Sequence, residues 1–299
     1  MSEDLAGITL AVIGGDDREL VLVSELIKRG AQVKVVGFPP HPELNGARIV
    51  SSLLMALDGV DAVILPMPGT DANGVVRAIY AQEQLILNEG ILSRLQPGTP
   101  LFIGVAKPYL RELIKKHSLR LIEIAELDDV AILNSIPTAE GAIQIAMEEL
   151  PITIHGSKAL VVGFGRCGIT LARTLKALGS DVFVAARKPA DLARCVESGY
   201  KPVKYSELPK VLPEIQVIFN TVPHLVLDSS RIALLGKECL IVDIAAAPGG
   251  TDFPAAQKAG IKAILAPGLP GKVAPKTAGK ILADVYPGLI LQELHRDRK

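Results

Sequence analysis

The segment Ala159–Leu175, ALVVGFGRCGITLARTL, decides the fold of the second half of this chain. An apolar run leads into Gly163-Phe164-Gly165-Arg166-Cys167-Gly168, a G-x-G-x-x-G, and a helical pattern follows. In this order the first glycine makes a tight turn, the second lets the backbone approach a pyrophosphate, and the third lets the helix pack closely on the strand. The helix start also offers free N–H groups and the positive end of a dipole. We therefore predict a dinucleotide site formed by the whole turn, with a purely structural glycine turn as the alternative.

The end of the next predicted strand indicates which dinucleotide binds. A protein that binds NAD usually has Asp or Glu about 20 residues beyond the glycine turn, where it holds the ribose hydroxyls. Here the strand ends in Arg187-Lys188 instead. Because two cations can pair with a 2′-phosphate, the sequence favours NADP over NAD. The alternative is a solvated basic turn that binds nothing.

Three later loops also follow apolar strands of this half. In doubly wound sheets ligands bind beyond the carboxyl ends of the strands, so we expect these loops to border the cofactor. The residues assigned to this border are Thr221, Val222, Pro223, Ala245 and Gly268. His224 could accept a proton near pH 7, or it is only a polar loop residue. For each loop taken alone, a tight turn without a ligand is the alternative.

Short β-branched runs alternate with amphipathic helical stretches along the whole chain, a pattern typical of α/β proteins with parallel sheets. Strands are predicted at Ile8–Ile13, Val33–Gly37, Asp61–Leu65, Pro100–Gly104, Arg120–Ile124, Lys158–Gly163, Asp181–Ala185, Gln216–Asn220, Cys239–Ile244 and Lys262–Leu265. First-half helices are predicted at Arg18–Arg29, Gly74–Gln84 and Tyr109–His117. We expect two doubly wound parallel-sheet domains: a flavodoxin-like domain at 1–150 for substrate or partner, and a Rossmann NADP-binding domain at 151–299.

Two linking helices complete this prediction. The first covers Ala139–Leu150, with Thr138 as its N-cap and with Ile136 extended because it precedes a proline. The second covers Thr277–Lys299, with Thr277 as its cap. From length and pattern, we expect this last helix to pack back on the first domain.

The first half also has a glycine turn, Gly14-Gly15-Asp16-Asp17-Arg18. It lacks a third glycine, and its two aspartates would repel phosphate, so we predict no second nucleotide site here. Arg18, at a helix start, could hold a substrate carboxylate. The alternative is that Arg18 pairs with Asp16 or Asp17.

The composition of the 299 residues excludes several classes of protein. Lys+Arg number 32 and Asp+Glu number 32, a balance that argues against nucleic-acid binding. The longest stretch without these four residues, Ile215–Leu227, is too short and polar to span a bilayer, and the start has no secretory signal. The three cysteines form no CxxC motif, so we expect them to be reduced thiols of a cytosolic protein. Cys167 is expected to be a packing residue in the glycine turn. The histidines are scattered, so no metal site is predicted.

Five motifs, in order, resemble the family of dipicolinate synthase A subunits. They are VIGGDDREL (12–20), NSIPTAEGAI (134–143), TIHGSKALVVGFGRCGITLAR (153–173), PGGTDF (248–253) and LAPGLPGKVAPKTAGKIL (265–282). The resemblance runs from about Thr9 to Leu282, and the last motif and the NSIPT segment are far more specific than the glycine turn.

The resemblance implies an NADP-dependent oxidoreductase of the mother-cell cytoplasm in sporulation, which oxidises dihydrodipicolinate to dipicolinate and yields NADPH. It also implies that the partner is the flavoprotein-like B subunit of dipicolinate synthase, a separate chain, while a homo-oligomer is possible. A substrate with two carboxylates would need cations and hydrogen-bond donors. The candidates are Arg18, Lys272 and Lys276 for the charges, and Asn134, Ser135, Thr138 and Thr277 for the hydrogen bonds. Two alternatives stay open: an NADP-binding partner protein that is inactive alone, and a shikimate- or hydroxyacid-type dehydrogenase, although no Lys–Asp or His–Glu pair stands out.

Overall fold

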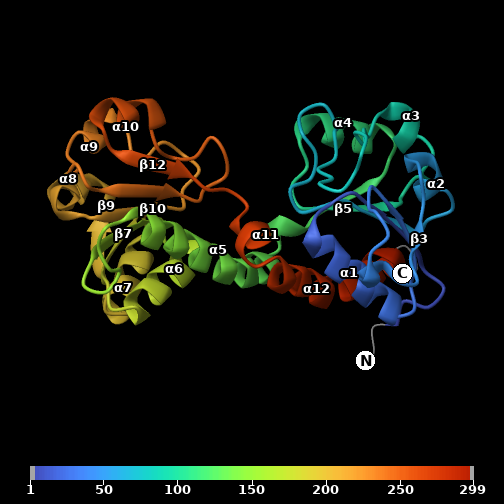
Figure 1. Cartoon of the computed structure of the whole chain (residues 1–299), viewed down its shortest axis with the longest axis horizontal. Coiled ribbons are helices and arrows are strands. Elements are labelled where there is room, and N and C mark those ends of the chain that lie inside the picture. Colours follow the sequence, from blue (N-terminus) through green and yellow to red (C-terminus); the bar gives the residue numbers. More distant parts are fainter. Residues whose placement is uncertain (1–3, 297–299) are drawn as a thin grey trace. The chain divides into compact units, whose positions relative to one another are not determined.

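The protein is described by a computed structural model that covers residues 4–296, and the chain forms two compact units. Unit 1 comprises residues up to Ala131 and from Ala274 onward, and unit 2 comprises Ile132–Val273. Residues 132–150, predicted as part of the first domain, therefore group with the second. Within the described residues each unit holds one six-stranded parallel sheet with helices on both faces (Figure 1). This arrangement confirms the predicted fold class.

Unit 1 follows the predicted alternation of strands and helices. Its elements are β1 (Thr9–Ile13), α1 (Asp17–Lys28), β2 (Gln32–Val36), η1 (Pro42–Leu44), β3 (Arg48–Ile49), α2 (Leu53–Leu57), β4 (Ala62–Ile64), α3 (Glu89–Leu92), β5 (Pro100–Ile103), α4 (Pro108–Lys116), β6 (Arg120–Glu123), η2 (Ile124–Glu126) and α12 (Pro275–His295). The strand order is β3-β2-β1-β4-β5-β6. Without the short edge strand β3, this is the flavodoxin-like order, and the chain reverses direction across the sheet between β1 and β4.

The predicted helix at Gly74–Gln84 is wrong. This segment is an irregular loop whose backbone hydrogen bonds run outside it, from Val76 to Leu85 and from Arg77 to Gly69. Gly74 has φ +81°, and an added Cβ there would meet the ring of Tyr109. Hydrogen bonds and packing with other segments therefore prevail over a local pattern of helical spacing.

The first linking helix is longer than predicted. Helix α5 (Asp128–Glu149) contains Pro137, so Ile136 is helical rather than extended and Thr138 is no N-cap. The hydroxyl of Thr138 donates instead to the Asn134 carbonyl at 2.7 Å. Proline removes one helical hydrogen bond, but the buried face of α5 packs on the second sheet and offsets that loss.

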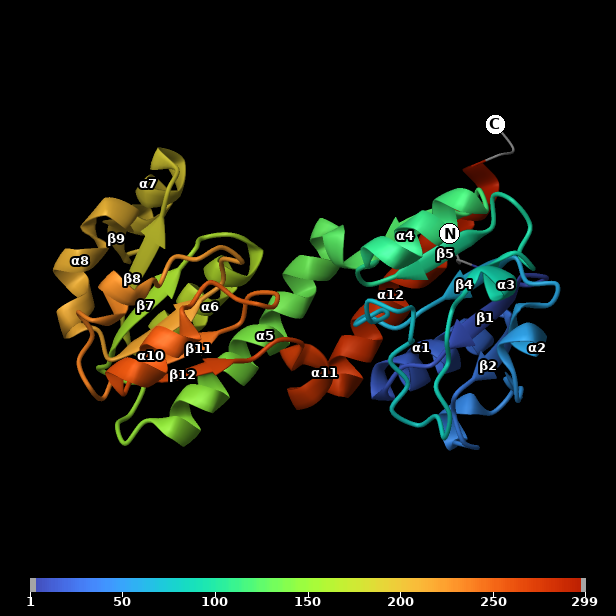
Figure 2. The ribbon, with the colours of Figure 1, turned by 90° about the horizontal axis from the view of Figure 1, so that it is seen from above.

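The last helix belongs to unit 1 by its contacts. Helix α12 begins at Pro275, two positions before the expected cap, so Thr277 lies in its first turn. It lies beside α1 (Figure 1, Figure 2), where an added Cβ at Gly279 would be 2.9 Å from the Arg18 carbonyl. A glycine is thus required for this close approach of two helices. Residues 297–299 of the predicted helix lie outside the described residues.

Unit 2 is the Rossmann unit. Its remaining elements are β7 (Lys158–Val162), α6 (Arg166–Ala177), β8 (Asp181–Ala186), α7 (Pro189–Glu197), β9 (Lys201–Lys204), η3 (Tyr205–Glu207), α8 (Leu208–Val211), η4 (Leu212–Glu214), β10 (Val217–Asn220), α9 (Ser229–Ile232), β11 (Leu240–Asp243), α10 (Phe253–Ala259), β12 (Lys262–Leu265) and α11 (Leu269–Val273). The strand order is β12-β11-β10-β7-β8-β9, with the reversal between β10 and β7.

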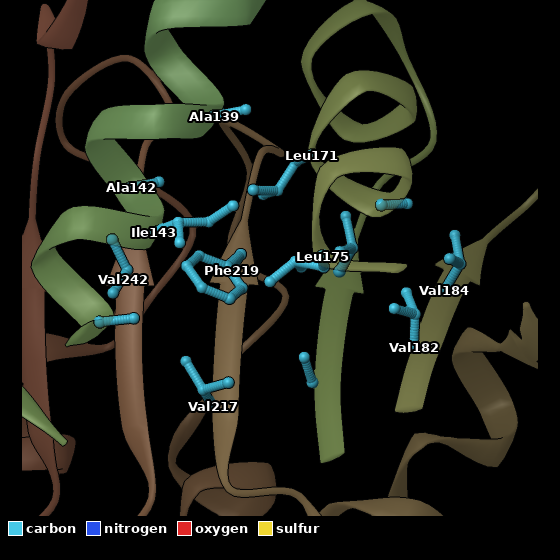
Figure 3. Packing of buried hydrophobic residues seen from close by; sticks show 14 of the residues in the cluster. Ala139, Ala142, Ile143, Leu171, Leu175, Val182, Val184, Val217, Phe219 and Val242 are labelled. Atoms are coloured by element: carbon cyan, nitrogen blue, oxygen red, sulfur yellow. The ribbon is translucent and has the colours of Figure 1, made fainter. Parts of the chain in front are cut away.

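The two faces of this sheet are covered by different helices. On one face, α5 and α6 contribute Ala139, Ala142, Ile143, Leu171 and Leu175, which belong to one buried cluster with Phe219 of the sheet (Figure 3). The opposite face packs against α8, α9 and α10. All six strands are parallel, so their carboxyl ends share one edge, and every loop predicted to border the cofactor leaves the sheet at that edge.

Candidate dinucleotide site

The glycine turn between β7 and α6 has the geometry that its spacing predicts. Gly163 has φ +96°, and an added Cβ would overlap the Thr221 hydroxyl and lie 2.8 Å from Val222 Cγ2. A Cβ at Gly168 would overlap the Gly163 carbonyl, so the helix can approach the strand only because this residue is glycine. At Gly165, by contrast, an added Cβ would meet nothing within 4 Å. The first and last glycines are therefore required by the protein itself, and the middle one borders open space.

The N-terminus of α6 is suited to an anion. Gly165 is its N-cap and has no side chain to cap the helix, and no acidic residue lies in the first turn. The first N–H groups of a helix lack partners within the helix and carry the positive end of its dipole. Open space at Gly165 and uncapped amides behind it fit the pyrophosphate of a dinucleotide.

The loop after β10 is held by the side chain of Asn220, which is fully buried. Its amide donates to the Val222 carbonyl at 3.0 Å and accepts from the Val222 N–H at 3.2 Å. The Thr221 hydroxyl donates to the Val162 carbonyl at 2.9 Å. These bonds fix Thr221 and Val222 against Gly163, so the structure brings together three of the predicted cofactor residues.

The loop after β11 depends on Asp243, which is also fully buried. Its carboxylate accepts from the Ala245 N–H at 3.1 Å, from the Gly250 N–H at 2.8 Å and from the Thr251 hydroxyl at 2.7 Å. The position of Ala245, a predicted cofactor residue, is thus set by a carboxylate that sequence analysis did not select. The signal was an aspartate at the carboxyl end of an apolar strand, followed by a glycine-rich loop.

The two loops are also tied to each other. Gly250 accepts hydrogen bonds from the Val226 and Leu227 N–H groups through its carbonyl. An added Cβ at Gly250 would be 2.7 Å from the Asn220 side chain. Asn220 and Asp243 therefore act as buried supports for one continuous rim along the carboxyl edge of the sheet.

The basic residues predicted for a 2′-phosphate follow β8. Arg187 and Lys188 are exposed, and no acid stands at the end of this strand. Burial raises the pKa of Tyr205, and the charges of Arg187 and Arg231 act in the opposite direction. Tyr205 directly follows β9, which pairs with β8, so cations and a half-buried phenol border the same end of the two strands.

The remaining predicted residues of the turn differ in their surroundings. Phe164 packs its ring edge-on against Tyr200, with centroids 6.1 Å apart, and belongs to the core. Cys167 is half-buried; burial raises its pKa, with Arg166 acting in the opposite direction, as fits a packing residue. Pro223 and His224 are both exposed in the loop after β10, and Gly268, with φ +69°, is exposed after β12.

The predicted hydrogen-bond donors of α5 are engaged inside the protein. Ser135 is fully buried; its hydroxyl donates to the Ile132 carbonyl and lies 2.6 Å from the Thr170 hydroxyl of α6. Thr138 bonds to its own helix, as described above. The Asn134 side-chain nitrogen is buried and has no hydrogen-bond partner within residues 4–296. Lys272, Lys276 and Thr277 are exposed, Lys272 in unit 2 and the other two in unit 1.

In unit 1, Arg18 is buried and paired with Asp16, as its alternative interpretation states. The guanidinium donates to both carboxylate oxygens, each at 2.8 Å. The first glycine turn has no open space: an added Cβ at Gly15 would overlap the carboxylate of Glu19. Glu19 accepts from the Asp16 N–H at 2.7 Å and from the Met67 N–H at 3.3 Å. A carboxylate of the protein thus occupies the helix N-terminus where a phosphate would bind.

Glu19 is an unusual group that sequence analysis missed. It is almost fully buried, and burial raises its pKa to about 7, while the nearby charge of Arg18 acts in the opposite direction. Beside it, Tyr286 of α12 is buried, and burial raises its pKa well above the ordinary value. Only the folded packing of α1, α12 and the loop after β4 makes this carboxyl distinctive, because its sequence position is that of an ordinary capping box.

Two protein families match separate parts of the chain. The N-terminal domain of the dipicolinate synthase A subunit matches residues 9–125. The NAD-binding domain of D-isomer specific 2-hydroxyacid dehydrogenases matches residues 138–248, which include the glycine turn. The match to a dehydrogenase domain agrees with the geometry of the turn.

Whole-chain relatives are more specific. The dipicolinate synthase A subunit of Bacillus subtilis (strain 168) is 41% identical over 289 residues, which cover 96% of this chain and 97% of that protein. The crystal structure of the dipicolinate synthase A subunit from Bacillus halodurans has a TM-score of 0.93 at 40% identity and covers 96% of this chain and 99% of that chain. An L-alanine dehydrogenase has a TM-score of 0.65 at 15% identity over 97% of this chain and 93% of that chain, which shows a shared fold only.

The fold, the glycine turn and these matches define an oxidoreductase with two α/β units, one of which binds a nicotinamide dinucleotide. Within that class, the chain belongs to the family of dipicolinate synthase A subunits, so the predicted family is confirmed. In the part of the chain that the structure describes, no helix is long and apolar enough to cross a membrane. The same residues contain no cluster of side chains that could hold a metal ion.

Proposed function

We propose that this protein oxidises dihydrodipicolinate to dipicolinate with NADP, together with the B subunit of dipicolinate synthase, in the mother-cell cytoplasm of a sporulating cell. The observation that carries the dinucleotide part is the open space at Gly165 in front of the uncapped amides of α6. The family to which the chain belongs supports dihydrodipicolinate as the substrate. NADP, when bound, supplies an acceptor for the hydride that leaves the substrate, and one proton is released as the ring becomes aromatic.

The positive charge after β8 is the reason that we propose NADP rather than NAD. Arg187 and Lys188 are exposed directly after β8, where an acidic side chain would hold the ribose of NAD. A guanidinium can bind a phosphate with two parallel hydrogen bonds. The half-buried Tyr205, which follows the adjacent strand, lies within electrostatic reach of Arg187 and offers a further hydroxyl.

The protein's own residues mainly bind and orient in this proposal. Asn220 and Asp243 hold the loops at the carboxyl edge, so that Thr221, Val222, Pro223 and Ala245 border the cofactor, with Gly268 after β12. Substrate carboxylates would be met by Arg18, Lys272 and Lys276, and by Asn134 and Thr277 as donors. The Asn134 side-chain nitrogen has an unused hydrogen, whereas the hydroxyls of Ser135 and Thr138 already donate theirs inside the protein and would have to exchange these bonds to reach a substrate. His224 is exposed beside the cofactor loop and is the proposed proton acceptor.

The reaction is tested with the purified full chain, dihydrodipicolinate and NADP, by following the absorbance of the reduced cofactor. Turnover by the chain alone supports assignment of the reaction to this chain, and a higher rate when the B subunit is added supports the role of the B subunit. Binding of NADP without turnover, and turnover only when the B subunit is present, would instead support a partner protein that is inactive alone. Oxidation of a hydroxyacid or of shikimate in place of dihydrodipicolinate would overturn the substrate assignment.

A second experiment separates the roles of the proposed anchors. Lys272→Ala and Lys276→Ala are expected to raise the KM for dihydrodipicolinate and to leave NADP affinity unchanged. Arg18→Ala has the same expected effect, but it also leaves Asp16 buried without its partner, so thermal unfolding is measured beside it. A KM equal to wild type in all three variants would remove these cations from the substrate site.

A further inference from the structure

The sheet of unit 1 has a switch point to which the proposed function assigns no ligand. The chain reverses direction across this sheet between β1 and β4, and in open α/β sheets ligands bind beyond the carboxyl ends of the strands at such a reversal. The loop after β4 folds back to the end of β1, because Ala78 forms a parallel bridge with Gly15. The segment 76–79 therefore borders the place where a ligand of unit 1 is expected.

Arg77 lies within this segment, and its backbone is held from two sides. Its carbonyl accepts from the Gly15 N–H at 2.9 Å, and its own N–H donates to the Gly69 carbonyl at 3.1 Å. Gly14 allows the close approach, because an added Cβ there would be 3.0 Å from the Arg77 carbonyl. The loops after β1 and β4 thus fix the backbone of this arginine at the switch point.

The side chain of Arg77 is exposed and is not bound by an acid. Within residues 4–296 it takes part in no ion pair and donates no side-chain hydrogen bond. Its charge nevertheless acts on the end of β1. Burial raises the pKa of Asp16, but Arg18 and, less strongly, Arg77 lower it below its ordinary value. The guanidinium therefore lies within electrostatic reach of the start of α1, with its hydrogen-bond donors available to a ligand.

The aspartates of the two loops are already bound inside the protein. Asp16 accepts from Arg18 at both carboxylate oxygens, each at 2.8 Å. Asp17 accepts a hydrogen bond from the hydroxyl of Tyr80. Asp71 accepts from two backbone N–H groups of its own loop, at 2.8 and 2.9 Å. These carboxylates are satisfied without Arg77, so an external anion can bind this cation without displacing an ion pair.

We infer that Arg77 binds a carboxylate of the substrate on unit 1, an inference that rests on the proposed function. A guanidinium matches a carboxylate with two parallel hydrogen bonds. Ile79, in the same segment, is 53% exposed and offers apolar surface to the ring that carries the carboxylate. The fixed backbone lowers the entropic cost of ordering the arginine when the substrate binds. Arg18, by contrast, would first have to leave Asp16.

The test is calorimetric titration of dipicolinate, which keeps both carboxylates of the substrate, into the full chain with NADP present. Arg77→Gln, which removes the charge, should weaken dipicolinate binding by about tenfold or more, the value of one charge-assisted contact. Arg77→Lys, which keeps the charge but not the paired donors, should lie between Arg77→Gln and wild type. In turnover, Arg77→Gln should raise the KM for dihydrodipicolinate more than it lowers kcat. NADP affinity and the melting temperature should stay at wild-type values.

Arg94→Gln is the matched control. This exposed arginine takes part in no ion pair within the described residues and lies on the segment that leads to the amino end of β5, away from the switch point. It should leave dipicolinate binding unchanged.

Wild-type dipicolinate affinity in Arg77→Gln would overturn the inference, as would an equal loss of NADP affinity. A wild-type chain that binds no dipicolinate, with or without the B subunit, would overturn it too. Failure of the proposed function has a different result: dihydrodipicolinate is not oxidised, while dipicolinate still binds and its binding still depends on Arg77.

Discussion

The carboxylate of Asp243 accepts a hydrogen bond from the hydroxyl of Thr251, with 2.7 Å between the oxygens. The two residues lie at opposite ends of the loop after β11, and Asp243 also binds the Gly250 N–H at 2.8 Å. One buried side chain therefore fixes both ends of a loop that we propose borders the cofactor. A change that breaks these hydrogen bonds should therefore lower both the stability of the protein and its affinity for the cofactor.

Thr251→Val should lower the free energy of unfolding by about 1–3 kcal/mol, because it leaves a buried carboxylate oxygen with one donor fewer. It should also weaken NADP binding through the displaced loop, as measured by titration. Asp252→Ala is the control: it removes the cap of α10, a bond from the Ala255 N–H at 3.0 Å, next to the same loop. This change should cost about 1 kcal/mol of stability and leave NADP affinity unchanged. Equal losses of affinity in both variants would contradict a specific role for Asp243–Thr251.

The three glycines of the turn should respond differently to alanine or valine. Gly165→Val has room for its side chain in the free protein, so stability should stay within about 1 kcal/mol of wild type. The added side chain would occupy the space of the pyrophosphate, and NADP binding should be lost in calorimetry. Gly163→Ala and Gly168→Ala, where an added Cβ overlaps Thr221 or the Gly163 carbonyl, should instead lower the melting temperature strongly. If the Gly165→Val protein binds NADP normally, the pyrophosphate does not bind at Gly165.

Arg187→Ala should weaken the binding of NADP but not that of NAD, since only NADP carries the 2′-phosphate. One charge-assisted contact corresponds to about 1.5–3 kcal/mol, or roughly a ten- to hundredfold change in the dissociation constant. Arg194→Ala, an exposed arginine of α7 that pairs with Glu197, is the control for loss of surface charge. If both cofactors are weakened equally, or neither is, Arg187 does not read the phosphate.

Glu19 should make the stability of the protein depend on pH. Its pKa is raised from 4.5 to about 7 in the folded state, so between these values the folded protein binds a proton that the unfolded chain has released. Stability contributed by a raised carboxyl is present below the unfolded pKa and is lost as pH rises through the folded pKa. Asp16 has a lowered pKa, despite its burial, because of Arg18, and it contributes in the opposite direction at lower pH.

Glu19→Gln separates these contributions, because it keeps the size of the side chain and removes the titration. The free energy of unfolding is measured by denaturant between about pH 5 and pH 8, the range in which carboxylates and histidines set stability. Relative to wild type, Glu19→Gln should gain stability as the pH rises to about 7, the folded-state pKa, and the difference should then level off. A difference between the two proteins that does not vary with pH would show that Glu19 titrates normally.

The sequence by itself determined the α/β class, the dinucleotide turn and most of the strands. Strands of parallel sheets are short apolar runs that local composition reveals, and the need for glycine at positions 163 and 168 follows from the spacing of the turn alone. The motifs between Thr9 and Leu282 also indicated the family. Each of these features depends on residues that are close together in the sequence, or on several such segments in a fixed order.

Only the tertiary structure decided the rest. The loop at 74–84 and the helix that continues through Pro137 arise because packing of distant segments offsets unfavourable local preferences. The hydrogen-bond partners of Arg18, Ser135 and Asp243 are set by the fold. The sequence therefore could not show which polar side chains already form hydrogen bonds inside the protein. Burial, which raises the pKa of Glu19, likewise exists only once the helices are packed.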